Sequence, residues 1–174
     1  MIYPYKNITP VTGKNCFIAQ SADVIGEVTM GDDCSVWFGC VVRGDVHYIR
    51  IGDRVNIQDL SMIHVTHWKN PDKSDGNPTI IEDDVTIGHR VMLHGCTIKK
   101  ACLIGMSATI LDGAVIGEES IVGAGSLVTK NKVFPPRSLI MGSPAKVVRT
   151  LHEEEVTELY RSAKRYVVFK NEYI

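Results

Sequence analysis

The sequence predicts an all-β protein, a parallel β-helix of hexapeptide repeats followed by a C-terminal α-helix. An aliphatic residue recurs at every sixth position over most of the chain, a period that fits neither an α-helix nor an uninterrupted β-strand. Glycine often follows the aliphatic residue, and a small residue usually fills the fifth position of the hexad. Three hexads make one triangular coil of about eighteen residues, and successive coils stack on one another.

The repeat runs from Ile18 and is interrupted twice. Three extra residues intrude between Val42 and Ile51, and about twelve residues beyond one hexad intrude before Ile81. The second interruption is polar and contains Gly and Pro, so we expect a protruding surface loop at about residues 66–79. The repeat positions are Ile18, Val24, Met30, Val36, Val42, Ile51, Ile57, Ile63, Ile81, Ile87, Leu93, Ile98, Ile104, Ile110, Ile116, Val122 and Val128.

The chain is expected to form one β-helix domain with short additions at its ends. Residues 1–17 lead into the domain, which spans 18–148, and the repeat fades after Val128 into lysines and prolines. Residues 149–174 are predicted to form a helix along the β-helix, since three glutamates at 153–155 favour a helix N-terminus. Its apolar face comprises Val156, Leu159, Tyr160, Ala163 and Val167.

Composition indicates an ordinary globular protein. The 174 residues carry a formal net charge of −1, so we expect no nucleic-acid-binding surface. No apolar stretch approaches eighteen residues and the first residues do not resemble a signal peptide, which predicts a cytoplasmic protein without a membrane span. Five cysteines without a C-x-x-C pair predict buried, reduced thiols rather than disulfides or a cysteine zinc site.

The positions of three histidines predict a metal site between subunits. His64 and His94 both occupy the second position of a hexad, 30 residues apart, and subtracting the 12-residue excursion leaves one coil of 18. They should therefore stack on one face at the usual strand spacing of roughly 4.8 Å, close enough to share an ion. His89 occupies the third position of its hexad and faces another way. A C3 trimer would bring His89 of one chain against His64 and His94 of another.

The chemistry of this ligand set points to catalysis. Three neutral imidazoles with an open fourth position are typical of a zinc centre that activates water, although iron or cobalt also suits such ligands. The alternative is that these histidines are ordinary polar residues on the surface of a β-helix.

Five motifs stand out along the repeat: Arg43-Gly-Asp45, Asn56-Ile-Gln58-Asp59, the run from Gly88-His89 to His94-Gly-Cys96, GMSATILDGA at 105–114, and IVGAGSLV ending at Val128. Together they resemble those of the γ-class carbonic anhydrase-like hexapeptide-repeat proteins. The resemblance implies a left-handed β-helix, a homotrimer with zinc at its interfaces, and His64, His89 and His94 as the metal ligands. It also implies reversible hydration of carbon dioxide to bicarbonate, in which hydroxide formed at the metal attacks carbon.

The resemblance assigns roles to further residues. Gln58 would hydrogen-bond the water on the metal, and Asn56 would support Gln58. Arg43 and Asp59 would pair across the trimer interface, with Asp45 nearby.

The sequence departs from the family pattern at Val46 and His67, where the archetypal enzyme has glutamates. His67 replaces a proton-shuttling residue and could shuttle protons itself, because its unperturbed pKa lies near 6.5; the alternative is a solvated loop histidine. By the resemblance, Tyr166 is the tyrosine expected to approach the site.

Two other functions remain open. The first is a metal-binding trimer without catalytic activity, which Val46 favours because the archetypal enzyme has a glutamate there. The second is a hexapeptide-repeat acyltransferase or acyl-CoA thioesterase, suggested by the shared repeat and by GSPAK at 142–146.

Overall fold

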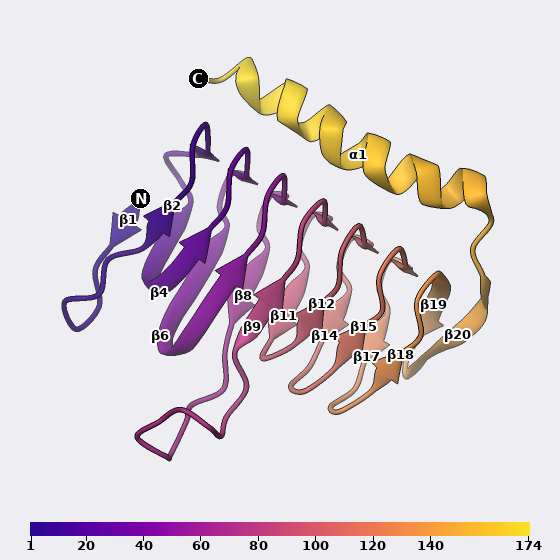
Figure 1. The fold of residues 1–174 in the computed structure, drawn as a ribbon, viewed down its shortest axis with the longest axis horizontal. Helices are drawn as coiled ribbons and strands as arrows, with labels where there is room; N and C mark the ends of the chain where they lie inside the picture. Colours follow the sequence, from indigo (N-terminus) through magenta and orange to yellow (C-terminus); the bar gives the residue numbers. More distant parts are fainter.

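The computed structural model describes residues 1–174 as a parallel β-solenoid with one helix at its C-terminal end (Figure 1). Twelve strands form one sheet and eight form another. The larger sheet covers two sides of the solenoid, because the two ends of the long strand β6 pair with different strands, β8 and β9. The predicted fold class is confirmed.

Most strands are only two or three residues long, because a turn returns in every hexad. They are β1 (Ile2–Tyr3), β2 (Val11–Thr12), β3 (Phe17–Ile18), β4 (Asp23–Met30), β5 (Ser35–Val36), β6 (Val41–Ile51), β7 (Asn56–Ile57), β8 (Met62–His64), β9 (Thr79–Ile81), β10 (Thr86–Ile87), β11 (Met92–His94), β12 (Thr97–Ile98), β13 (Leu103–Ile104), β14 (Thr109–Ile110), β15 (Val115–Ile116), β16 (Ile121–Val122), β17 (Leu127–Val128), β18 (Val133–Phe134), β19 (Ser138–Gly142) and β20 (Ala145–Thr150).

The aliphatic repeat forms the core. Every predicted repeat position from Val24 to Val128 is buried, while Ile18 is half-buried. The repeat does not fade directly after Val128 as expected, because Phe134 and Ile140 continue it at six-residue spacing and are also buried. The lysines and prolines around these two residues occupy outward positions, which hid the hexads from the sequence pattern.

The first residues also join the β-structure. Strands β1 and β2 both pair in parallel with β4. The predicted excursion at 66–79 protrudes as a loop whose base is closed by an antiparallel bridge between Thr66 and Asn77. Buried His47 contacts this loop, with Nε2 3.2 Å from the carbonyl oxygen of Asp75.

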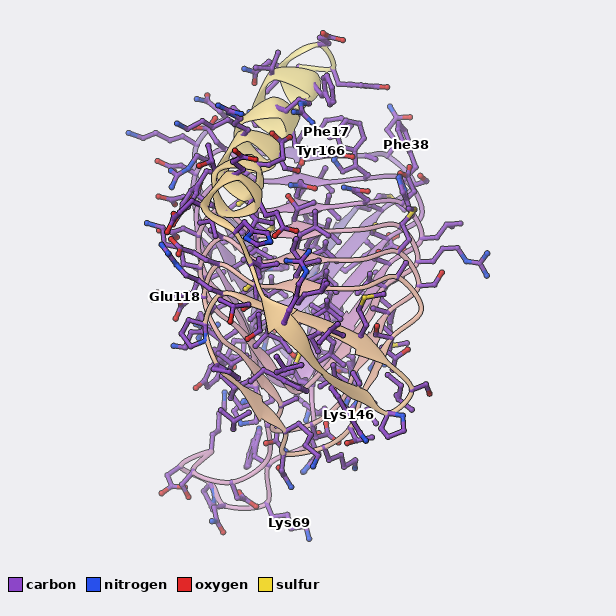
Figure 2. All side chains as sticks on the ribbon, turned by 90° about the vertical axis from the view of Figure 1, so that its right-hand side faces the viewer. Phe17, Phe38, Lys69, Glu118, Lys146 and Tyr166 are labelled. Carbon is purple, nitrogen blue, oxygen red and sulfur yellow. The ribbon has the colours of Figure 1, made fainter.

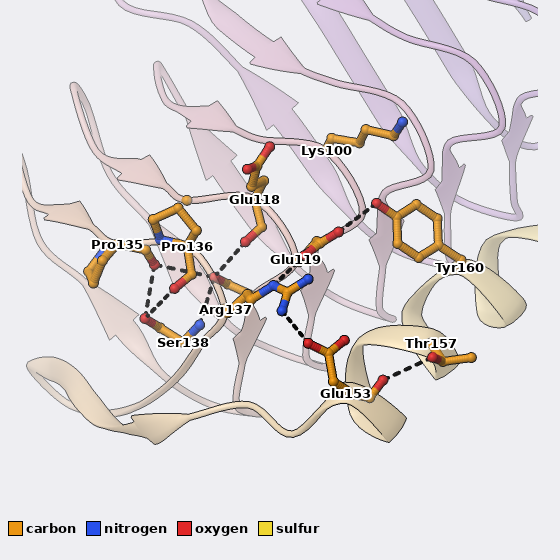
Figure 3. Close-up of polar contacts among 12 residues, drawn as sticks. Lys100, Glu118, Glu119, Pro135, Pro136, Arg137, Ser138, Glu153, Thr157 and Tyr160 are labelled. Atoms are coloured by element: carbon orange, nitrogen blue, oxygen red, sulfur yellow. Dashed lines mark hydrogen bonds and ion pairs between the residues drawn. The ribbon is translucent and has the colours of Figure 1, made fainter.

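The helix α1 (Glu153–Asn171) contacts β5 and β10, and its buried Val156 and Leu159 pack with Leu103, Ile121 and Leu139. Polar contacts fix its N-terminal half (Figure 3). The Tyr160 hydroxyl donates a hydrogen bond of 2.9 Å to Glu119, and Arg137 donates one of 2.7 Å to the same carboxylate.

The helix and the loop project from opposite sides of the solenoid. Figure 2 shows Tyr166 of the helix far from Lys69 of the loop, and Figure 1 agrees. All five cysteines are free thiols; four are buried as predicted, whereas Cys16 is half-buried. The single helix is too polar to cross a lipid bilayer.

Candidate functional site

His64 and His94 lie side by side at the base of the loop. Strands β8 and β11 pair in parallel with His94 directly opposite His64, which confirms the register predicted from the repeat. The imidazole rings are 5.1 Å apart between centroids, and Nδ1 of His64 lies 3.2 Å from Nε2 of His94. One nitrogen from each ring therefore faces the other.

This spacing suits a shared metal ion. Two nitrogens each 2.0–2.1 Å from a tetrahedral ion lie about 3.3 Å apart, close to the 3.2 Å between these two atoms. The donor set, neutral imidazole nitrogen, is one that zinc, iron and cobalt accept. The chain supplies only two such nitrogens here, so a complete site needs a further ligand.

Each ring is held by a carboxylate on its other nitrogen. Oδ1 of Asp45 lies 3.0 Å from Nε2 of His64, and Oδ1 of Asp112 lies 2.6 Å from Nδ1 of His94. Carboxylates commonly orient metal-binding histidines in this way. The arrangement leaves the two facing nitrogens available to an ion.

His89 lies apart from the other two histidines, as the register predicts. It is exposed beside the helix, and its Nδ1 is 2.9 Å from Oδ2 of Asp59. A cavity of about 300 Å³ joins these two residues to Tyr166 of the helix. His89 thus also pairs with a carboxylate and keeps one ring nitrogen free.

Asn56 and Gln58 are buried together on the face that carries His89. Nε2 of Gln58 donates a hydrogen bond of 3.1 Å to Oδ1 of Asn56, whose own amide nitrogen donates one of 3.0 Å to Thr86. Gln58 and His89 line a second cavity, of about 180 Å³, with Met106. The predicted support of Gln58 by Asn56 corresponds to this contact, while the role of Gln58 stays a prediction.

The remaining predicted residues lie at several places. Arg43 forms an ion pair with Asp45 within the chain, and the predicted pair of Arg43 with Asp59 between subunits stays a prediction. His67 is exposed on the loop and stacks on Trp68, with ring centroids 5.7 Å apart.

Burial and hydrogen bonds shift the pKa values of three residues of this site, Asp45, Asp112 and His64. Burial opposes ionisation of Asp45, but hydrogen bonds from His64 and Arg43 outweigh it and lower its pKa. Burial likewise opposes ionisation of Asp112, yet bonds from Thr66, Lys130 and His94 lower its pKa to about 2. Burial lowers the pKa of His64, which favours the neutral imidazole that a metal requires.

The sequence reasoning missed several residues of this cluster, among them Thr79 and Asp112. The Thr79 hydroxyl donates a hydrogen bond of 2.6 Å to the carbonyl of His64 and accepts one of 3.0 Å from the amide of Gly95, so it ties the two histidine strands together. Asp112 was missed as the partner of His94. The repeat is one residue short between Leu93 and Ile98, so the register places Asp112 over Gly95, and counting coils from His94 does not find it.

Comparison with known proteins places the chain in a family. Residues 95–130 match the family described as bacterial transferase hexapeptide, six repeats. A carbonic anhydrase from Geobacillus kaustophilus is 48% identical over 96% of this chain and 87% of its own length. The mitochondrial gamma carbonic anhydrase 1 of Arabidopsis thaliana is 45% identical over 90% of this chain. The chain belongs to the γ-class carbonic anhydrase-like hexapeptide-repeat family.

Members of this family carry more than one functional name. The chain spans only 56% of the Arabidopsis protein. A crystal structure described as a putative acetyltransferase from Bacillus cereus superposes with a TM-score of 0.91 at 47% identity, covering 99% of this chain and 96% of that one. Fold and family are therefore established, whereas the names of relatives point to two different reactions.

Proposed function

We propose that this protein is a cytoplasmic, metal-dependent enzyme that reversibly hydrates carbon dioxide to bicarbonate. The observation that carries the proposal is the pair of imidazole nitrogens of His64 and His94, 3.2 Å apart, each on a ring whose other nitrogen meets a carboxylate. Relatives named carbonic anhydrase support the reaction. Five free thiols suit a reducing compartment.

The proposed site is shared between subunits of a homotrimer. His64 and His94 lie at the loop base, while His89 lies beside the helix with its own carboxylate partner. His89 of a neighbouring subunit would complete a set of three imidazoles and leave one position open. Asp59 would then lie close enough to that interface to pair with Arg43 of the neighbour.

A zinc ion bound there, or iron or cobalt in its place, would act as a Lewis acid that lowers the pKa of a water molecule to about 7. The chain's own residues orient the reactants. Because Nε2 of Gln58 is engaged by Asn56, its Oε1 remains free to accept a hydrogen bond from water. Burial and the charge of Asp59 raise the pKa of Tyr166, so its hydroxyl stays protonated and can donate to bicarbonate.

The proton released by hydration must reach bulk solvent. His67 is exposed on the loop that begins just after His64, and an imidazole that reaches solvent can act as a proton shuttle. We assign this transfer to His67.

Stopped-flow measurement of carbon dioxide hydration by zinc-loaded and iron-loaded protein tests the proposal. We expect activity above background that is lost in His94→Ala and retained in His152→Ala, a histidine at the N-cap of the helix. If the metal-loaded wild type hydrates carbon dioxide no faster than the uncatalysed reaction, the proposed activity is wrong. Stoichiometric metal in that inactive protein would instead support the alternative of a metal-binding trimer without catalytic activity.

A second candidate function is that of a hexapeptide-repeat acyltransferase or acyl-CoA thioesterase, which moves the acyl group of a coenzyme A thioester to an acceptor or to water and releases the free thiol. The Bacillus cereus structure described as a putative acetyltransferase favours it, as does the matched transferase repeat family. Turnover of acetyl-CoA that survives removal of metal by a chelator would establish this function. Turnover that is absent with and without chelator would eliminate it.

A further inference from the structure

Asp112 contacts three other side chains at the base of the loop, next to His64 and His94. Its Oδ1 accepts hydrogen bonds from Nδ1 of His94, at 2.6 Å, and from the Thr66 hydroxyl. Its Oδ2 lies 2.9 Å from the ammonium group of Lys130. Asp112 is buried, and these three contacts come from three different coils or loop segments.

The contact with His94 fixes which ring nitrogen carries hydrogen. A carboxylate only accepts hydrogen bonds, so Nδ1 of His94 is the nitrogen that carries hydrogen in the uncharged imidazole that a metal requires. Nε2 then carries the lone pair, and Nε2 is the atom that faces Nδ1 of His64. The carboxylate thereby selects the tautomer that can bind an ion at the shared position.

Thr66 fixes the carboxylate in turn. It is the residue whose backbone bridges to Asn77 and closes the base of the loop. Its hydroxyl donates to Oδ1, the same oxygen that meets His94. The loop base and the orientation of the His94 ring therefore depend on one oxygen atom.

We propose that Asp112 is a positioning residue for the metal site, which holds His94 in its Nδ1-protonated tautomer and links that ring to the loop base through Thr66. This inference rests on the proposed metal site. It goes beyond the three histidines, because it states which carboxylate prepares one of them before any ion arrives.

Nitrogen-15 NMR of histidine side chains in the metal-free protein tests the inference directly. In the wild type we expect the His94 signals of an Nδ1-protonated ring. In Asp112→Ala we expect them to shift toward the Nε2-protonated form that free imidazoles prefer. Asp112→Asn keeps an acceptor oxygen at this position, so it should restore most of the wild-type tautomer if it folds.

Metal affinity provides the second readout. Competition of cobalt(II) with a chelator, followed by the visible spectrum, should show affinity roughly 10- to 100-fold lower in Asp112→Ala than in the wild type. Thr66→Val should give a smaller loss in the same direction. Lys130→Met is the control, since Lys130 is exposed and contacts only the other oxygen, and it should leave the tautomer unchanged.

The outcomes separate this inference from the proposed function. A wild-type tautomer and a cobalt affinity within twofold of wild type in Asp112→Ala would overturn the role of Asp112. A wild type that binds no cobalt would overturn the proposed metal site, and with it the positioning role.

Discussion

A β-carbon on Gly95 would lie 2.7 Å from Oδ1 of Asp112. Gly95 directly follows His94, and its amide and carbonyl groups bond to His64 and Gly113 on the coils on either side. Its backbone is left-handed, with a φ of +56°. The absence of a side chain here gives the Asp112 carboxylate the room that it needs beside the His94 ring.

Gly95→Ala should therefore impair metal binding as well as stability. The new methyl group would push the carboxylate away from His94, and the positive φ would add strain of about 1 kcal/mol or more. We expect lower cobalt affinity and a lower free energy of unfolding in urea. Gly125→Ala is the matched control, because Gly125 has a φ of +66° but no atom within 4 Å of the new carbon. Equal cobalt affinities in the two variants would contradict this account.

Mixing two defective chains tests whether the site is shared. His64→Ala and His89→Ala should each bind little metal alone. Co-expressed in equal amounts, they should assemble trimers in which about one interface in four has intact residues on both sides, since each side is intact in half of the chains. Bound zinc per subunit should then rise to about a quarter of the wild-type value.

The control for this experiment mixes His64→Ala with His94→Ala. Both substitutions damage the same side of the proposed interface, so no combination of these chains restores a complete site. Zinc content that stays low in both mixtures would contradict a shared site. A monomeric wild type in analytical ultracentrifugation would contradict it as well.

The sequence was sufficient to predict the stacking of His64 and His94. The hexad period fixes which residues point inward, and parallel coils pair without an offset, so counting residues gives the neighbour on the next coil. The same counting predicted that His89 lies on a different face of the solenoid from His64 and His94. This success depended on removing the loop excursion from the count.

The carboxylate partners were harder to predict, for a reason specific to this repeat. The repeat between Leu93 and Ile98 has five residues instead of six. Asp112 therefore lies over Gly95 rather than over His94. Its contact with His94 is diagonal and depends on side-chain rotation, which a period of six does not encode. Likewise, only the folded chain shows that Asp59, predicted to face a neighbour, lies beside His89.

The docking of the helix should weaken in acid. Burial opposes ionisation of Glu119, but hydrogen bonds from Tyr160 and Arg137 lower its pKa below the usual 4.5. A carboxyl whose pKa is lower in the folded state contributes stability above its unfolded pKa, and this contribution is lost as pH falls through the folded pKa. The free energy of unfolding should therefore fall progressively as the pH is lowered below about 4.5.

Glu119→Gln should remove this part of the pH dependence. The amide can still accept a hydrogen bond from Tyr160 but carries no charge, so we expect a stability loss of roughly 1–2 kcal/mol at pH 7 and a smaller difference from wild type at pH 3. Urea unfolding followed by circular dichroism at both pH values measures the two differences. Glu118→Gln is the control, because the Glu118 side chain is exposed and forms no ion pair. If Glu118→Gln matched Glu119→Gln, general surface charge rather than the Glu119 contacts would stabilise the docked helix.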